Sequence, residues 1–256
     1  MCYIIPSFST LTGVISRNGA LIGALMLSAC AAAPLPEGTN DPFEDRNRQI
    51  HAFNVGVDKA LLRPAATTYD SVLPEPLEQG IANFAANLDG PGDVLNNLLQ
   101  GRPGPALENT LRFALNTTVG IGGLFDPATA LGVDGDPTDF GETLHIWGAP
   151  EGSYAEVPFI GPTVERDLVG TLVDVAMNPL RFVLPKPESS YATAAKLASR
   201  LGDRSRYSET VDSILYDSAD SYAQTRLLYL QNRRFELGQT VGEDNFEDPY
   251  EDIYAD

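Results

Sequence analysis

The sequence predicts an all-α protein built from many short amphipathic helices, with minimal β structure. Apolar residues recur at every third or fourth position through most of the chain, which is the helical period. Nineteen prolines and 23 glycines interrupt these repeats, so few helices can run long. The predicted extended segment, residues 154–159, contains Pro158, which has no N–H and cannot lie in a central strand.

The first 29 residues predict a lipoprotein signal peptide that is removed. Residues 19–29 form an uncharged apolar run after Arg17 that is too short to span a bilayer. The run ends in Leu27-Ser28-Ala29-Cys30, which resembles the bacterial lipobox, where the cysteine thiol receives a diacylglycerol. Residues 30–40 then form a lipidated tether. The alternative is a buried cysteine that follows an ordinary core helix.

The first helix of the mature chain is predicted from Asp41 to about Leu62. Asp41-Pro42-Phe43-Glu44 combines an N-cap acid, a proline in the first turn and a nearby glutamate. Arg63-Pro64 is predicted to end the helix. Its apolar stripe consists of Phe43, Ile50, Phe53, Val57 and Leu61.

The same period predicts the remaining helices. They cover residues 76–88, 94–101, 105–119, 139–147, 163–177, 189–202 and 207–237, the last with a break near Asp220. The glycine-rich stretch 120–127 indicates a close backbone crossing or a hinge. We expect Thr163 to cap its helix, with Val164, Leu168, Leu172 and Val175 on the buried side.

Charge and composition exclude several functions. With 17 basic and 35 acidic side chains the formal net charge is −18, so nucleic acid is an unsuitable partner. Residues 238–256 form an acidic disordered tail, which is either simply solvated or attracts a basic partner. His51 and His145 are the two histidines and no Cys-x-x-Cys occurs, so we predict no metal site, no cofactor and no catalytic residues.

Short motifs follow one another in a fixed order from Asp41 to Leu237. They are Asp41-Pro42-Phe43-Glu44, Asn47-Arg48, Phe53-Asn54, Arg63-Pro64, Arg112-Phe113, Gly123-Leu124-Phe125-Asp126, Phe140-Gly141-Glu142-Thr143-Leu144, Gly148 and Arg166-Asp167. In this order they resemble the MlaA (VacJ) family of outer-membrane lipoproteins. We therefore interpret residues 41–237 as an MlaA-like helical domain.

The resemblance implies a ring of helices that lies in the membrane plane, with a loop hairpin and a central amphipathic channel. It implies a lipid-anchored protein on the periplasmic side of the outer membrane of a Gram-negative bacterium. Such a protein extracts mislocalised phospholipids from the outer leaflet and passes them to a soluble periplasmic lipid carrier. A trimeric porin is the other implied partner.

The resemblance also suggests roles for individual residues. Asn47 and Asn54 lie two helical turns apart on one polar face, so with Phe53 they are candidates for the lipid path. The alternative is a face turned to solvent. Gly148 is the candidate hinge of the hairpin. The other family residues are expected to be structural: Arg63, Pro64, Arg112, Phe113, Phe140, Gly141, Arg166 and Asp167.

Two other classes of function stay open at this point. A periplasmic lipid-directed hydrolase would need a nucleophile within hydrogen-bond reach of His51 or His145. A passive scaffold lipoprotein would have a ring whose centre is packed solid. The position of the two histidines and the packing at the centre therefore distinguish these alternatives.

Overall fold

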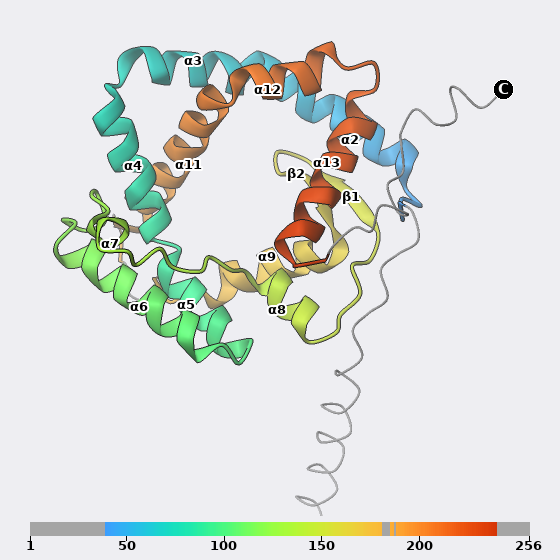
Figure 1. The fold of residues 1–256 in the computed structure, drawn as a ribbon. Helices are drawn as coiled ribbons and strands as arrows, with labels where there is room; N and C mark the ends of the chain where they lie inside the picture. The colour runs from blue at the N-terminus through green and yellow to red at the C-terminus, as the bar shows by residue number, and fades with distance from the viewer. Residues whose placement is uncertain (1–38, 181–184, 187, 240–256) are drawn as a thin grey trace, which may run out of the picture.

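A computed structural model describes residues 39–180, 185–186 and 188–239, and their helices follow one another around a ring (Figure 1). The elements in chain order are α2 (Glu44–Val57), η2 (Asp58–Leu62), α3 (Arg63–Val72), α4 (Glu75–Asn87), α5 (Gly90–Leu99), α6 (Pro103–Thr118), α7 (Pro127–Ala130), α8 (Phe140–Ile146), β1 (Tyr154–Val157), β2 (Gly161–Val164), α9 (Glu165–Met177), α11 (Glu188–Arg206), α12 (Ser208–Asp212), η3 (Ser213–Asp217) and α13 (Ser221–Glu236). The predicted all-α fold with minimal β structure is confirmed, since the described residues form one two-stranded sheet. The predicted signal peptide, Cys30 and the tail beyond Gln239 lie outside the described residues.

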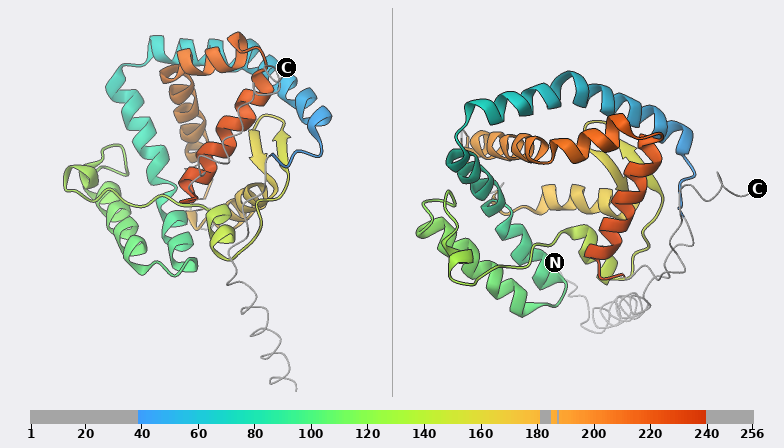
Figure 2. Two further views of the ribbon diagram at one scale, coloured as in Figure 1. Left: turned by 45° about the vertical axis from the view of Figure 1, so that its right-hand side comes forward. Right: turned by 45° about the horizontal axis from the view of Figure 1, so that its top comes forward.

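Residues 44–72 form one continuous helical run, which corrects the prediction that Arg63-Pro64 ends the first helix (Figure 2). The π-helix η2 directly precedes Arg63 and shifts the backbone hydrogen bonds by one residue. Pro64 then lies in the first turn of α3, where a missing N–H costs little. The chain therefore passes the proline without leaving the helix.

Asp41 closes the ring instead of capping the first helix. The helix begins at Glu44, and no side chain caps it. The Asp41 carboxylate accepts hydrogen bonds from Asn47 Nδ2 at 2.8 Å and from Arg226 Nη1 at 2.8 Å, and it also binds the Tyr222 hydroxyl. Because Tyr222 and Arg226 belong to α13, these contacts join the first and last described helices.

The hairpin β1–β2 packs against α2 and α13. The strands are antiparallel, with Tyr154 opposite Val164, and Pro158 lies in the turn between them. Thr163 therefore belongs to a strand, which corrects its predicted role as a helix cap, and Val164 takes the N-cap position of α9. The small apolar core of Tyr154, Val164, Tyr222 and Leu230 lies between the hairpin and α13.

Glycines allow close approaches at two places. Gly123 has a φ of 97°, and a Cβ there would lie 2.7 Å from the Cβ of Asn87, so close packing explains the stretch 120–127. At the contact of α8 and α9, a Cβ on Gly170 would lie 2.7 Å from the Cα of Gly141. The two backbones thus meet with no room for a side chain.

We expect Gly170→Ala to lower the free energy of unfolding by about 2–3 kcal/mol, because the new methyl group would overlap the backbone of α8. Gly56→Ala is the matched control, since Gly56 lies inside α2 with no atom near its absent Cβ. That control should gain about 0.5–1 kcal/mol from helix propensity. Thermal unfolding in detergent measures both, and equal effects of the two substitutions would contradict the close contact.

Candidate functional site

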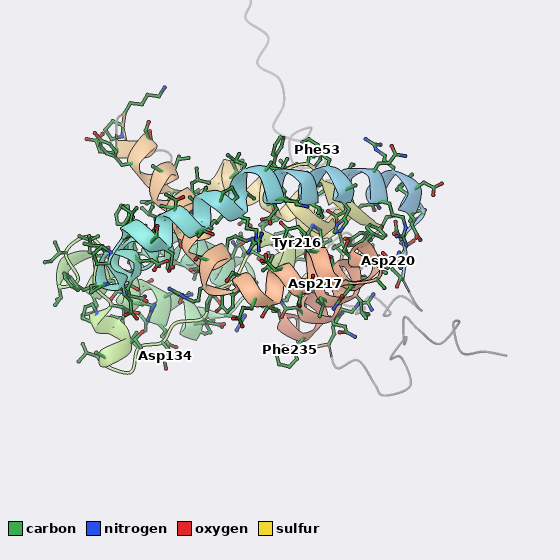
Figure 3. The ribbon with its side chains drawn as sticks, turned by 90° about the horizontal axis from the view of Figure 1, so that it is seen from above. Phe53, Asp134, Tyr216, Asp217, Asp220 and Phe235 are labelled. Carbon is green, nitrogen blue, oxygen red and sulfur yellow. The ribbon has the colours of Figure 1, made fainter. Side chains whose placement is uncertain are left out.

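The apolar stripes of the helices face outward. Phe43 at the start of α2, Phe53 on α2 and Leu61 on η2 are exposed, whereas Asn47, His51 and Asp58 are buried. Leu172 and Val175 of α9 are likewise exposed, which corrects the prediction that they lie on the buried side of this helix. Figure 3 shows Phe53 and Phe235 projecting from opposite edges of the molecule. A surface of this kind suits contact with lipid more than contact with water.

The buried side chains are mostly polar. Across the described residues, 13 polar or charged residues are buried, against nine apolar ones, and six of those nine are alanine or tyrosine. The same residues include no helix long and apolar enough to cross a bilayer. The molecule therefore offers apolar faces of short helices to its surroundings and keeps amides and ion pairs inside.

Asn47 and Asn54 hold the hairpin against α2. Asn47 is 3% exposed; its amide donates to the carbonyl oxygen of Tyr154 at 3.2 Å and accepts from the N–H of Glu156 at 3.1 Å. Asn54 donates to the carbonyl oxygen of Val157 at 3.1 Å and accepts from the N–H of Phe159 at 2.9 Å. These bonds use both ends of each amide and join α2 to the hairpin, and the place of Asn47 and Asn54 along the lipid path stays a prediction.

His51 joins α2, the hairpin and α13. Its Nδ1 lies 3.1 Å from Glu156 Oε1 and its Nε2 lies 3.1 Å from Ser221 Oγ. This Ser-His-Glu order is the arrangement that the hydrolase alternative requires. However, His51 is buried, and none of these three side chains lines any of the cavities described below. We therefore interpret the contacts as a structural joint.

A network of ion pairs connects α8, α9 and α13. Arg233 Nε lies 3.0 Å from Asp167 Oδ2, and Arg233 Nη2 lies 2.7 Å from Asp139 Oδ1. The Tyr229 hydroxyl donates to Asp167 Oδ2 at 2.8 Å. Burial disfavours the charged form of Asp139, but the hydrogen bond and charge of Arg233, together with the N–H groups of Glu142 and Gly141, outweigh it, so the pKa of Asp139 lies below its usual value.

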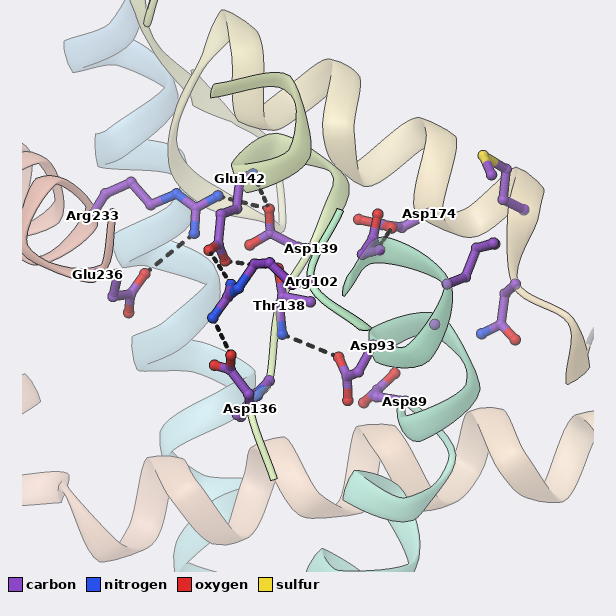
Figure 4. Close-up of a pocket in the computed structure, with 16 residues that line it drawn as sticks. Asp89, Asp93, Arg102, Asp136, Thr138, Asp139, Glu142, Asp174, Arg233 and Glu236 are labelled. Carbon is purple, nitrogen blue, oxygen red and sulfur yellow. Dashed lines mark hydrogen bonds and ion pairs between the residues drawn. The ribbon is translucent and has the colours of Figure 1, made fainter. Parts of the chain in front are cut away.

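This network borders an acidic cavity of about 650 Å³ between α5, the segment 136–139, α9 and α13 (Figure 4). Two arginines, Arg102 and Arg233, line it together with seven carboxylates: Asp89, Asp93, Asp136, Asp139, Glu142, Asp174 and Glu236. Arg102 binds Asp136 and lies 3.1 Å from Glu142 Oε1. The cavity is therefore polar and carries more negative than positive charge.

Two of these carboxyls hold their protons more tightly than usual. Burial, with repulsion from Asp89 and Asp174, raises the pKa of Asp93 to about 7, although the N–H of Thr138 partly opposes this. Burial also raises the pKa of Asp174. Near neutral pH the cavity can thus gain or lose a proton at Asp93.

Asp93→Asn should stabilise the fold at pH 8 by about 2 kcal/mol. A pKa near 7 in the folded state, against about 4 unfolded, corresponds to roughly 4 kcal/mol, and solvent contact removes about half of it. The native protein binds the extra proton, so its stability falls as pH rises from 4 to 7, and the variant loses this slope. Thermal unfolding at pH 5 and pH 8 measures the effect. The exposed Asp134→Asn serves as the control and should keep the slope.

A second cavity of about 810 Å³ adjoins the first, and Asn178 lines both. Its lining includes the apolar side chains of Leu88, Val175 and Leu180 and the two lysines Lys186 and Lys196. Lys196 also binds Asp89 of the first cavity. An acidic chamber therefore continues into a space with apolar walls and two cations.

The remaining family residues are placed in structural contacts. Arg63 binds Asp212, and Pro64 follows it in α3. Arg112 binds Asp126 at 2.6 Å, while Phe113 packs under Gly90 and Phe140 meets Trp147 edge to face. Gly141 lies at the crossing with α9. Arg166 is buried, with its Nε 3.5 Å from Asp167 and its Nη1 3.4 Å from His145 Nδ1.

Sequence reasoning missed Arg233, Asp93 and Glu156. Asp93 and Arg233 lie 140 positions apart, and nothing in the local pattern marks either as different from a solvent-facing charge. Glu156 lies two residues after Tyr154 in β1, so both side chains point to the same buried face of the strand. The described residues contain no group of three or more His, Cys, Asp and Glu side chains that could hold a metal ion.

A helical ring that buries amides and ion pairs and exposes apolar side chains defines a protein of the membrane interface. Its particular family follows from comparison with known proteins. The model of the MlaA lipoprotein family matches residues 39–236, and the chain belongs to this family.

Named relatives agree over most of the chain. The intermembrane phospholipid transport system lipoprotein MlaA of Haemophilus influenzae is 33% identical over 85% of this chain and 88% of its own length. The protein of the same name from Escherichia coli K12 is 32% identical over 84% of this chain and 85% of its own. An uncharacterized protein of Rickettsia bellii is 34% identical over 75% of each chain.

A solved structure shares the fold. It comes from work on the structural basis for maintenance of bacterial outer membrane lipid asymmetry, and it is 29% identical with a TM-score of 0.65. The match covers 77% of this chain and 98% of that one. MlaA proteins are lipid-transport lipoproteins of the outer membrane and not enzymes, so the predicted absence of catalysis is confirmed.

Proposed function

We propose that this protein extracts mislocalised phospholipids from the outer leaflet of the outer membrane and passes them through a central amphipathic channel to a periplasmic lipid carrier. The observation that supports this most is the reversed polarity of the ring, with apolar residues outside and polar residues inside. A headgroup that crosses hydrocarbon unaided loses its hydration, which costs several kcal/mol. A polar passage within an apolar ring removes that cost.

The two adjoining cavities are the best candidate for the lipid site. The acidic chamber suits the ammonium of a zwitterionic headgroup, and Lys186 and Lys196 suit its phosphate. The apolar wall of the second cavity suits an acyl chain. A solid centre, as expected for a passive scaffold, would leave no room for these cavities. Phe53, which is exposed and packs on Phe159, stays a candidate contact for lipid.

The proposed anchor and partners complete the pathway. Acylation at Cys30 would hold the ring on the periplasmic side of the membrane, and the tether 30–40 would let it lie in the interface. A trimeric porin would give the ring a fixed place in the outer membrane. The relatives named as parts of an intermembrane phospholipid transport system support a soluble lipid carrier on the periplasmic side.

Surface phospholipid in living cells tests the transport proposal. Deletion of the gene should raise the amount of phospholipid in the outer leaflet, and the wild-type chain should restore it. Cys30→Ala should fail to restore it if the anchor is needed. Ser221→Ala tests the hydrolase alternative, because loss of the hydroxyl that contacts His51 should leave transport unchanged. Unchanged surface phospholipid after deletion would reject the proposal.

Gly148 is proposed as the hinge of the hairpin, and Gly148→Ala should reduce transport. The residue has a φ of 87°, which alanine adopts only with strain of about 1 kcal/mol. We therefore expect a modest loss of stability in this variant in addition to its effect on transport. Gly238→Ala, at a φ of 68° near the end of α13, is the matched control for strain. Equal surface phospholipid in the two variants would count against the hinge.

A further inference from the structure

A third cavity, separate from the candidate lipid site, lies between α3, the end of α11 and α12, next to η2. η2 and η3 come together through Asp58, whose Oδ2 accepts a 2.5 Å hydrogen bond from the Tyr216 hydroxyl. Figure 3 shows Tyr216 beside the α2–α3 run, and Figure 1 shows α3 and α12 running along the same side of the ring. π-helical turns are rare and often occur at functional sites. The hydrogen bond between the two π-helices is next to the cavity, because Asp58 also binds Arg204 in its wall.

The cavity holds about 580 Å³ and is lined by three cations, Lys59, Arg63 and Arg204. Asp212 also lines it and binds both arginines, at 2.7 Å in each case. Asp58 does not line the cavity, but its carboxylate binds Arg204 at 2.8 Å. Three cations and two carboxylates leave one positive charge in excess, although the whole chain carries a formal net charge of −18.

Several donors here have no acceptor. The Arg204 side chain is 10% exposed, and its Nη1 is buried without a hydrogen-bond partner. Lys59 makes no ion pair with any residue that the structure describes. Ser205 and Ser208 place two further hydroxyls in the wall. A buried guanidinium nitrogen without a partner is costly, so an anion in this cavity would restore bonds that the protein leaves unmade.

The chemistry of the wall selects the ligand. Guanidinium, ammonium and hydroxyl donors around one space suit a tetrahedral anion with several acceptor oxygens. Leu61 and Tyr207, next to the cavity in sequence, are exposed apolar residues that could meet an attached chain. We propose that this cavity binds a phosphate group through Lys59, Arg63 and Arg204, carried by a phospholipid headgroup or free in solution.

This phosphate site lies away from the acidic cavity, and only a lipid source of the phosphate rests on the proposed function. A fluorophore on Asp70→Cys, exposed on α3, would report on this cavity in the full chain in a phosphate-free detergent. The probes are dihexanoylphosphatidylglycerol, dihexanoylglycerol and inorganic phosphate.

Lys59→Ala should weaken binding of the phosphate-bearing probe about tenfold, the usual effect of losing one charge-assisted hydrogen bond. Lys59→Arg should restore it, and Arg46→Ala, an exposed cation of α2 outside the cavity, should change nothing. Lys59-dependent binding of the phospholipid but not the diacylglycerol supports a headgroup. The same dependence with inorganic phosphate alone supports a free anion.

Equal affinities for Lys59→Ala and Arg46→Ala with every probe would overturn the phosphate site. This result would leave the transport proposal intact, because that proposal depends on surface phospholipid in cells. Conversely, unchanged surface phospholipid would reject transport while Lys59-dependent binding to the purified protein could still be measured. The two experiments therefore fail independently.

Discussion

Replacing Arg233 by leucine should lower the free energy of unfolding by about 3 kcal/mol. The side chains of Arg233 and Asp167 are 12% and 9% exposed, so the change leaves a buried carboxylate with only the more distant Arg166, at 3.5 Å, as a cation partner. It also removes the 2.7 Å contact with Asp139, which caps α8. Three helices lose their shared contact at once, which is why this single substitution should have a large effect.

Thermal unfolding in detergent measures this loss, and Arg206→Leu is the control. Arg206 lies 3.9 Å from Asp203 with both side chains about half exposed, so its loss should change stability by less than about 0.5 kcal/mol. Because the pKa of Asp139 is lowered in the folded state, the contribution of Asp139 to the free energy of unfolding is present above about pH 4. This contribution is lost as the pH falls further. Similar effects of the two substitutions would contradict the network.

A double variant, Val169→Asp with Leu172→Asp on the exposed face of α9, should release the unacylated chain from membranes. Val169 and Leu172 are exposed by 50% and 65% and lie one turn apart. An aspartate costs roughly 2.5 kcal/mol in hydrocarbon and less at the interface, so the double variant should bind vesicles at least tenfold more weakly. Its stability in detergent should stay nearly unchanged, since neither side chain is buried.

Flotation with phospholipid vesicles measures this effect in a Cys30→Ser background, which removes the predicted acyl anchor and leaves the contribution of the apolar surface. Gln49→Asp, on the exposed polar side of α2, is the control and should float like its parent. If the double variant also floats like its parent, this face of α9 does not contact lipid.

Helix positions were largely predictable, because they depend on local sequence. Apolar spacing and the punctuating prolines located α4, α6 and α8, and the break near Asp220 separates η3 from α13. The wrong predictions concern residues whose position depends on contacts with residues far away in the sequence. Asp41 binds α13 instead of capping a helix, and Thr163 joins a strand because the hairpin pairs it with Ala155.

The direction in which each apolar stripe points was not predictable from its period. A stripe such as Phe43, Phe53 and Leu61 has the same spacing whether a core or lipid covers it. The position of Asn47 likewise depended on the hairpin, 107 residues away, that accepts its hydrogen bond. The cavities were not predictable either, because side chains from several helices line each of them.

The amino-acid sequence alone determined the helical class, the order of the elements and the family resemblance, because these depend on spacing and motifs along the chain. The tertiary structure decided which faces are buried, how the carboxylates and arginines are paired, and where the cavities lie. These features depend on which segments meet after the ring closes, and neither the charge of a residue nor its period specifies its partner.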